Sequence, residues 1–340
     1  MLRLPPPRGP LSASVLERLT TPPTRAVPLP SADEVADPLG DDDLHLALYL
    51  CYELSYRGLP GVDDDWEWEP ALVALRRQLE RTFESALRET VSSMPAPPAH
   101  EVDLALRELI EGDDAPSLSR YLERRGRLGH VLEFMVHRSA YQLKEADPHS
   151  FAIPRLSGPA KAALVEIQSD EYGGGRPERV HAELFRRSMH AVGLDDRYGA
   201  YLESLPGATL ATVNLMSMCG LQRRLRGAIV GHLATFEMTS SIPNRRYGNA
   251  LRRLGFGVEA TAFFDEHVEA DAVHENLAAV DLAGGLVADE PRLGPDVLWG
   301  AGALLELDGR WARHVLASWR EGRTSLLASP EAAVAWRTPA

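Results

Sequence analysis

Residues 260–282 combine the residue types of a metal site with the spacing of a helix. The stretch ATAFFDEHVEADAVHENLAAVDL contains no glycine or proline, and its large apolar residues recur at helical intervals, so it predicts an α-helix. His267, Asp271 and His274 fall at steps of four and three on the face that also carries Phe264. Burying these groups without partners is costly. Two imidazoles and a carboxylate one turn apart are able to bind a metal ion, and hydrogen bonds to neighbouring helices are the alternative.

Three more ionisable residues interrupt or end the apolar stripes of other predicted helices. They are Glu145, Glu171 and His181. Together the six residues supply three imidazoles and three carboxylates from four helices, which suits the ligand shell of two iron or manganese ions. Mixed nitrogen and oxygen donors without thiolate favour these metals over structural zinc. Three carboxylates would also offset most of the charge of two divalent ions.

Two motifs resemble a known family. EYGGGRPERVHAELF places Glu171 ten residues before His181, and HVEADAVH is a His-x3-Asp-x2-His helix. With YQLKEADPHSFAIPRLSGPAKAALVEIQSDEYGGG, they resemble the haem-oxygenase-like diiron oxidases and oxygenases, often labelled iron-containing redox enzymes. The resemblance implies a seven-helix fold without haem, O2 as co-substrate, a homodimer and two ferrous ions, with manganese the second choice. The ligands that it implies are Glu145, Glu171, His181, His267, Asp271 and His274.

The resemblance also implies a chemistry. Members of this family use O2 for N-oxygenation of amines, or for oxidative C–C cleavage and decarboxylation, on small substrates such as amino acids, other amines or fatty acids. Glu237, in the apolar segment HLATFEMTSS, is a candidate catalytic residue facing the metal or a substrate amine, unless it pairs with an arginine. Arg245 and Arg246 are candidates for binding a substrate carboxylate, or are solvated. No flavin or nicotinamide motif is visible, so an external electron donor or the substrate would supply electrons.

Three other interpretations compete. Glu178, three residues before His181, mimics the carboxylate-x2-His helices of ferritin-like diiron bundles. We prefer Glu171 because Glu178 follows Pro177 in a first helical turn, where the helix dipole alone favours an acid. A metal-free member of the same fold would serve as a binding or scaffold module. A haem oxygenase would need a proximal histidine on an early helix, and the nearest candidate, His45, has acidic neighbours that predict exposure.

The rest of the chain predicts helix after helix. Segments of helical periodicity are separated by glycine and proline, and no segment alternates with period two over more than a few residues. We therefore expect an all-α, haem-oxygenase-like bundle of about seven core helices with an extra N-terminal helical segment. In that segment Glu53 lies in an apolar run, where it is either a buried carboxylate or, as we prefer, the partner of Arg57 four residues on. The expected domains are a Pro-rich flexible arm (1–38), an N-terminal helical unit (39–91), a Pro-rich linker (92–100), the diiron domain (101–325) and a tail (326–340).

The composition of the chain argues against several classes of binding partner and of protein. The net charge of −13 argues against binding to nucleic acid or to an anionic membrane surface. The two cysteines, Cys51 and Cys219, exclude a disulfide scaffold and a thiolate zinc site and fit a reducing compartment. No run of about 18 apolar residues occurs, and prolines interrupt the N-terminus where a signal peptide needs an apolar core. We expect a soluble cytoplasmic enzyme with a small-molecule substrate.

Overall fold

The computed structural model describes residues 4–23, 35–92 and 94–327, apart from the side chains of 271–273, and these residues form helices and no strand. This confirms the all-α prediction. The first seven α-helices are α1 (Pro10–Leu19), α2 (Asp42–Glu53), α3 (Pro70–Thr90), α4 (Val102–Glu111), α5 (Leu118–Arg125), α6 (Leu128–Gln142) and α7 (Asp147–Ser150). The others are α8 (Gly158–Glu171), α9 (His181–Ala191), α10 (Gly207–Leu221), α11 (Arg226–Arg253), α12 (Val258–Asn276), α13 (Gly285–Asp289) and α14 (Gly294–Arg320).

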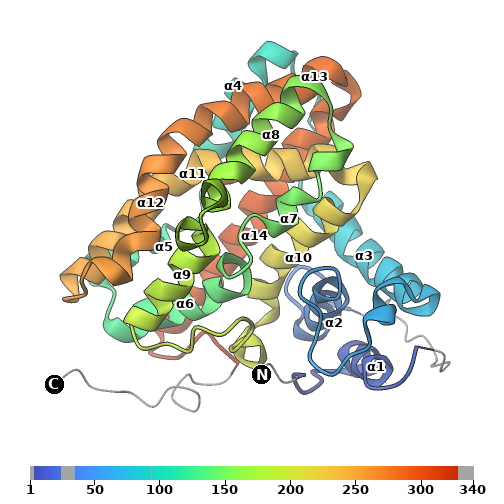
Figure 1. Ribbon diagram of the computed structural model, residues 1–340, viewed down its shortest axis with the longest axis vertical. Helices are drawn as coiled ribbons and strands as arrows, with labels where there is room; N and C mark the ends of the chain where they lie inside the picture. The colour runs from blue at the N-terminus through green and yellow to red at the C-terminus, as the bar shows by residue number, and fades with distance from the viewer. Residues whose placement is uncertain (1–3, 24–34, 93, 328–340) are drawn as a thin grey trace.

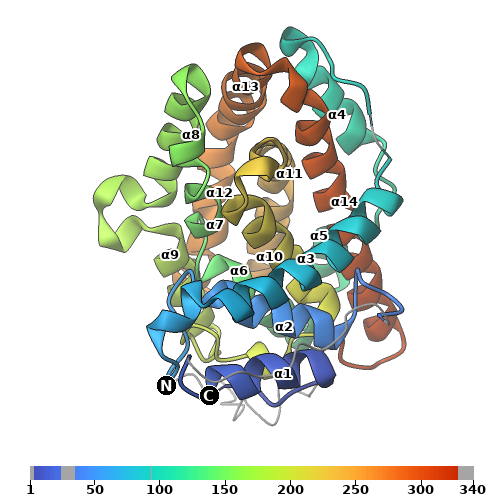
Figure 2. The same ribbon diagram turned by 90° about the vertical axis from the view of Figure 1, so that its right-hand side faces the viewer.

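Helix α11 lies between α12 and α14 in the middle of the molecule (Figures 1 and 2). Glycines allow α11 and α14 to approach closely. A Cβ atom on Gly231 would lie 1.8 Å from the carbonyl oxygen of Val297, and one on Gly300 would lie 2.0 Å from that of Ala228. No side chain fits at such distances, so the two backbones touch directly at this crossing.

Helix α12 contains the predicted helix of residues 260–282 only in part. It ends at Asn276, and the chain continues as a π-helix over Leu277–Gly284, which buries Ala278 and Leu282. A π-helix has wider turns than an α-helix, and such segments are frequent at functional sites. None of the described helices is both long enough and apolar enough to cross a lipid bilayer.

Helices α1, α2 and α3 lie together at one end of the molecule (Figures 1 and 2). Helix α1 falls within the predicted arm, and Asp43 of α2 accepts hydrogen bonds of 2.8 Å from the backbone N–H groups of Leu11 and Ser12 at the start of α1. Helix α2 packs on α10. Most of the predicted tail, and residues 24–34 of the arm, lie outside the described residues, and the domain boundaries stay a prediction.

Candidate metal centre

A turn of three glycines brings Glu171 and His181 together. Glu171 is the last residue of α8, and His181 is the first residue of α9. The intervening Gly173, Gly174 and Gly175 have φ values of 68°, 59° and 77°, a left-handed conformation that glycine adopts without steric cost. These glycines therefore serve to reverse the chain so that the ends of two helices meet.

Glu145 lies in a tight turn just after α6. The next residue, Ala146, has a φ of 73°, which is unfavourable for a residue with a Cβ atom. Two contacts hold the turn in place. The Nε2 group of Gln168 donates a 2.8 Å hydrogen bond to the carbonyl oxygen of Ala146. Lys144 donates a 3.0 Å hydrogen bond to Glu53, and both of these side chains are 1% exposed.

The first group of potential ligands consists of Glu145, Glu171, His181 and His267, all buried. Each offers one ligand atom, and these atoms lie within 4.8 Å of one another. The Oε2 atom of Glu171 lies 2.9 Å from Nδ1 of His181, and Oε2 of Glu145 lies 3.6 Å from Nε2 of His267. The side chains come from α8, α9, α12 and the turn after α6, so folding assembles a site that is not local in sequence.

The second group consists of Glu171, Glu237 and His274, also buried, with ligand atoms within the same 4.8 Å limit. The Nδ1 atom of His274 lies 3.5 Å from Oε2 of Glu237, which α11 contributes. Glu171 belongs to both groups. A carboxylate between two sets of ligands is the arrangement in which one side chain can bridge two metal ions.

Hydrogen bonds fix the orientation of two of the histidines. The Nδ1 atom of His267 lies 2.8 Å from the carbonyl oxygen of Phe263, to which it donates. The Nε2 atom of His274 lies 3.1 Å from Oδ2 of Asp170, and the carboxylate accepts from it. In each imidazole the other ring nitrogen then points toward the carboxylates. Such contacts are typical of metal-binding histidines, because they set the tautomer.

The pKa values reflect buried carboxylates beside imidazoles. Burial raises the pKa of Glu145. Burial also acts to raise the pKa of Glu171, but the imidazole of His181 outweighs it and the pKa falls to about 2. Burial acts to lower the pKa of His181, but the neighbouring carboxylates of Glu171 and Glu145 together raise it. For His274 burial is likewise outweighed, by Glu237 and Asp170, so the pKa rises to about 9. The metal-free cluster thus holds protons that a metal ion would displace.

The donor set fits iron. Four buried atoms of the two groups make no hydrogen bond among the described residues: Glu145 Oε2, Glu171 Oε2, His181 Nδ1 and His274 Nδ1. Each of these atoms makes one of the carboxylate–imidazole contacts described above, and a cation bound among them would replace the protons that those contacts hold. An internal space of about 10 Å³ is bounded by Glu145, Glu171, Glu237 and His267, among others. Nitrogen and carboxylate donors without thiolate match ferrous iron or manganese.

The structure brings together five of the six predicted ligands. The side chain of the sixth, Asp271, lies outside the described part of the chain. Glu237, predicted as a catalytic residue, lies in the second group. Glu178, the competing carboxylate, is exposed and belongs to neither group.

The expectation that His45 is exposed was wrong. His45 is not exposed but fully buried, and both of its ring nitrogens already have partners in Pro38 and Asn214. It is therefore not free to bind haem. Arg245 is exposed, and Arg246 lies 3.4 Å from Ser119. Neither arginine lines the cavity described next.

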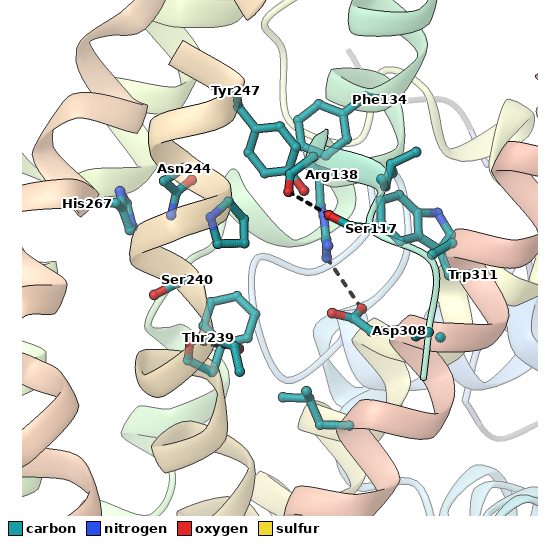
Figure 3. Close-up of a pocket in the computed structure, with 18 of the residues that line it drawn as sticks. Ser117, Phe134, Arg138, Thr239, Ser240, Asn244, Tyr247, His267, Asp308 and Trp311 are labelled. Atoms are coloured by element: carbon teal, nitrogen blue, oxygen red, sulfur yellow. Dashed lines mark hydrogen bonds and ion pairs between the residues drawn. The ribbon is translucent and has the colours of Figure 1, made fainter. Parts of the chain in front are cut away.

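A cavity of about 280 Å³ opens beside the first group, and Glu145 and His267 line its inner end. Aromatic side chains of Phe134, Phe236 and Tyr247 form much of its wall. Figure 3 shows this pocket with Arg138 inside it. Sequence reasoning missed Arg138, which lies in α6 one helical turn before its last residue, Gln142.

Comparison with known proteins agrees with this geometry. The model of a family described as iron-containing redox enzymes matches residues 132–309, which include both groups of ligands. A nitrosourea synthase from Streptomyces achromogenes subsp. streptozoticus is 26% identical over 239 residues, covering 68% of this chain and 51% of the relative. The chain therefore spans about half the length of the curated relative that it matches.

Proposed function

The chain belongs to the family of iron-containing redox enzymes, and from this premise we propose that it is a non-haem diiron enzyme that activates O2 to oxidise a small substrate. The observation that carries the proposal is the pair of buried ligand groups that share Glu171. One group alone would suit a single ion. Two groups joined by a carboxylate favour two ions.

Each ion has its own residues in this proposal. Glu145, His181 and His267 would hold the first ion, and Glu237 and His274 the second, with Glu171 shared. Asp271 remains a predicted ligand, one turn from each histidine of α12. Glu237 is thus proposed as a metal ligand rather than as a contact to a substrate amine.

The protein itself would position the ligands, enclose the substrate and exclude water from the cavity. Ferrous ions bound by these residues would supply electrons to O2, and the protein supplies the ligands and the pocket. Because Glu145 and His267 line both the ligand cluster and the cavity, a substrate in the cavity lies directly against the first group. The aromatic walls keep water away from this end.

The similarity to a nitrosourea synthase supports N-oxygenation over oxidative C–C cleavage. Its name describes the synthesis of a nitrosourea, a product that contains an oxidised nitrogen. We therefore favour N-oxygenation of a nitrogen-containing substrate over oxidative C–C cleavage or decarboxylation. An external electron donor would complete the cycle when the substrate does not supply all the electrons.

Metal stoichiometry tests the proposal. The purified chain is stripped of metal, titrated with Fe²⁺ without O2, desalted and analysed for iron per chain. We expect two irons per chain, and rapid O2 consumption when substrate amines are present. Binding of no iron, or of one, would overturn the diiron proposal. Continued uptake of iron far beyond two per chain on exposure to O2 would support the ferritin-like alternative instead.

A further inference from the structure

The N-terminal helices contact the turn that carries the predicted ligand Glu145. Helix α2 and the turn that follows it precede the region that matches the family model. From there Glu53 contacts Lys144, and Arg57 contacts Leu143, which are the two residues directly before Glu145. A part of the chain outside the matched region therefore reaches one of the metal ligands.

The first of these contacts is a buried ion pair. Both carboxylate oxygens of Glu53 are occupied, because Oε2 accepts the 3.0 Å hydrogen bond from Lys144 and Oε1 accepts one of 2.6 Å from the hydroxyl group of Tyr198. The ammonium group of Lys144 also lies over the rings of Tyr56 and Tyr49, 4.1 and 4.7 Å from their centroids. A buried ammonium needs such compensation, so these contacts confine the Lys144 side chain to one position.

The second contact joins Arg57 to the backbone of the same turn. Its Nη2 group donates a 2.8 Å hydrogen bond to the carbonyl oxygen of Leu143, and its guanidinium stacks over the ring of Tyr198 at 4.2 Å. Tyr198 links the two contacts, because it also donates to Glu53. The backbone of Leu143 and the side chain of Lys144 are therefore held by the same end of α2.

The turn needs such support because its conformation is unfavourable. Ala146 has a positive φ, and such a conformation persists only where the surrounding structure determines it. On the other side of Glu145, Gln168 of α8 holds the carbonyl oxygen of Ala146. Glu145 thus lies between residues held by α2 and a residue held by α8. Removing the outer contacts that orient a metal ligand typically weakens metal binding by about 10- to 100-fold.

We propose that Glu53 and Arg57 position Glu145 and thereby set the affinity of the first ligand group for iron, an inference that rests on the proposed function because it concerns the same site. Neither residue belongs to a ligand group, so each acts through the turn and not on the metal itself. The second group does not contain Glu145. The effect of Glu53 and Arg57 is therefore confined to one of the two irons.

Arg57→Gln is the decisive variant, because Arg57 is exposed and its loss leaves no buried charge unpaired. Iron affinities are measured without O2 by competition with a coloured Fe²⁺ chelator, and urea unfolding of the same samples measures stability. The variant should bind one iron at least about tenfold more weakly than the wild-type protein, and the other iron with unchanged affinity. Arg57→Lys keeps a donor for the carbonyl oxygen of Leu143 and should recover part of the loss.

Two double variants test the ion pair and identify the iron that is affected. Glu53→Gln with Lys144→Met removes the ion pair without leaving either charge alone in the interior, and it should weaken the same iron at least about tenfold. In Glu237→Gln, which is expected to keep only the iron of the first group, Arg57→Gln should weaken the iron that remains. An unchanged affinity for that iron would contradict the role of Glu145.

Arg253→Gln is the matched control. Arg253 is also exposed, and its Nη2 group donates a 2.8 Å hydrogen bond to the carbonyl oxygen of Leu122 in α5, but neither residue adjoins a ligand in the sequence. This variant should keep both iron affinities of the wild-type protein even where its stability falls. Wild-type iron affinities in Arg57→Gln, or a loss no greater than in the control, would overturn the positioning role.

Iron binding by the wild-type protein separates this proposal from the proposed function. Two irons in the wild-type chain, both retained with full affinity in Arg57→Gln, would overturn the positioning role alone. Absence of iron from the wild-type protein would overturn the diiron proposal, and the positioning role with it.

Discussion

The Oε2 atom of Glu171 faces the Nδ1 atom of His181 at 2.9 Å, yet neither atom takes part in a hydrogen bond among the described residues. Both atoms belong to the first group of potential ligands, so a cation held by that group would replace the proton that the pair holds in the metal-free protein. Attraction between carboxylate and imidazolium accounts for the pKa shifts of the metal-free protein, whereas a shared cation accounts for the geometry. We give more weight to the grouping of the ligand atoms, because any carboxylate beside an imidazole shows such pKa shifts, whether or not the pair binds a metal ion.

Glu171→Gln should remove both irons, because Glu171 belongs to both ligand groups. Glu237→Gln should remove one, because Glu237 belongs only to the second group. Iron per chain after anaerobic loading and desalting distinguishes the two variants, and circular dichroism confirms that each remains folded. Equal iron content in the two variants would show that Glu171 is not shared.

His267→Ala should lose iron without unfolding, because the substitution removes a nitrogen ligand and the contact to Phe263 but leaves the apolar side of α12 in place. The loss is expected to be at least tenfold in iron affinity. His100→Ala is the control, because the side chain of His100 is 80% exposed and remote from both groups. Two firmly bound irons in His267→Ala would contradict the assignment.

The sequence was sufficient to predict the helical architecture and to single out five buried residues that the structure brings together, and the reason is physical. Histidines and carboxylates on apolar stripes need compensation, so His267, His274 and Glu171 were recognisable as unusual from their positions alone. Glu237 was recognisable too, but its contact with His274 was not, because that contact depends on how α11 packs on α12.

Contacts between distant segments explain the errors. Glu53 was expected to pair with Arg57, but α2 ends at Glu53, so the helical spacing on which that pairing depends is lost. Its partner is Lys144, 91 residues away. Arg138 was missed because an arginine near the end of an amphipathic helix is usually solvated, and nothing local indicates that Asp308 will lie beside it.

Lys144→Met should destabilise the protein by about 3–5 kcal/mol, because it leaves the carboxylate of Glu53 buried without its countercharge. Adding Glu53→Gln should restore part of the loss, since Tyr198 can still donate to the amide oxygen. Urea unfolding measures both variants, and Lys161→Met, a substitution at a less buried lysine, is the control. A loss in Lys144→Met no greater than in the control would contradict this account.

Acidification should weaken the fold through His45. Burial lowers the pKa of His45 to about 4, against an ordinary value of 6.5, so the unfolded chain binds the proton more readily than the folded chain. Stability is therefore present above pH 6.5 and is lost as the pH falls toward 4, by about 2 kcal/mol from this residue between pH 7.5 and 5.

The pH dependence of unfolding in His45→Gln provides the check. This variant is expected to be less stable at every pH, but its loss of stability on going from pH 7.5 to 5 should be about 2 kcal/mol smaller than that of the wild-type protein. His190→Gln, at a side chain that is 78% exposed, should keep the wild-type slope. An unchanged slope in His45→Gln would assign the acid sensitivity to other groups.

Gly231→Ala should destabilise the protein by at least about 1–3 kcal/mol, because the new methyl group would clash with the carbonyl oxygen of Val297. Gly129→Ala makes the same chemical change in α6 where a Cβ atom meets nothing within 4 Å, and it should be neutral or stabilising. Thermal unfolding of the two variants tests the comparison. Equal melting temperatures would mean that the crossing relaxes without cost.

The direct backbone contact between α11 and α14 gives the pocket a fixed length. Helix α11 contributes Glu237 to the ligand groups, and α14 contributes Asp308 to the opposite side of the cavity. With no room for side chains between the two helices at Gly231 and Gly300, sliding of one helix past the other would bring residues with a Cβ atom into this close contact. The length of the cavity would then limit the length of the substrate. A change in the preferred substrate size would come from substituting residues of the cavity wall, such as Phe134 or Phe236, rather than from movement of α11 or α14.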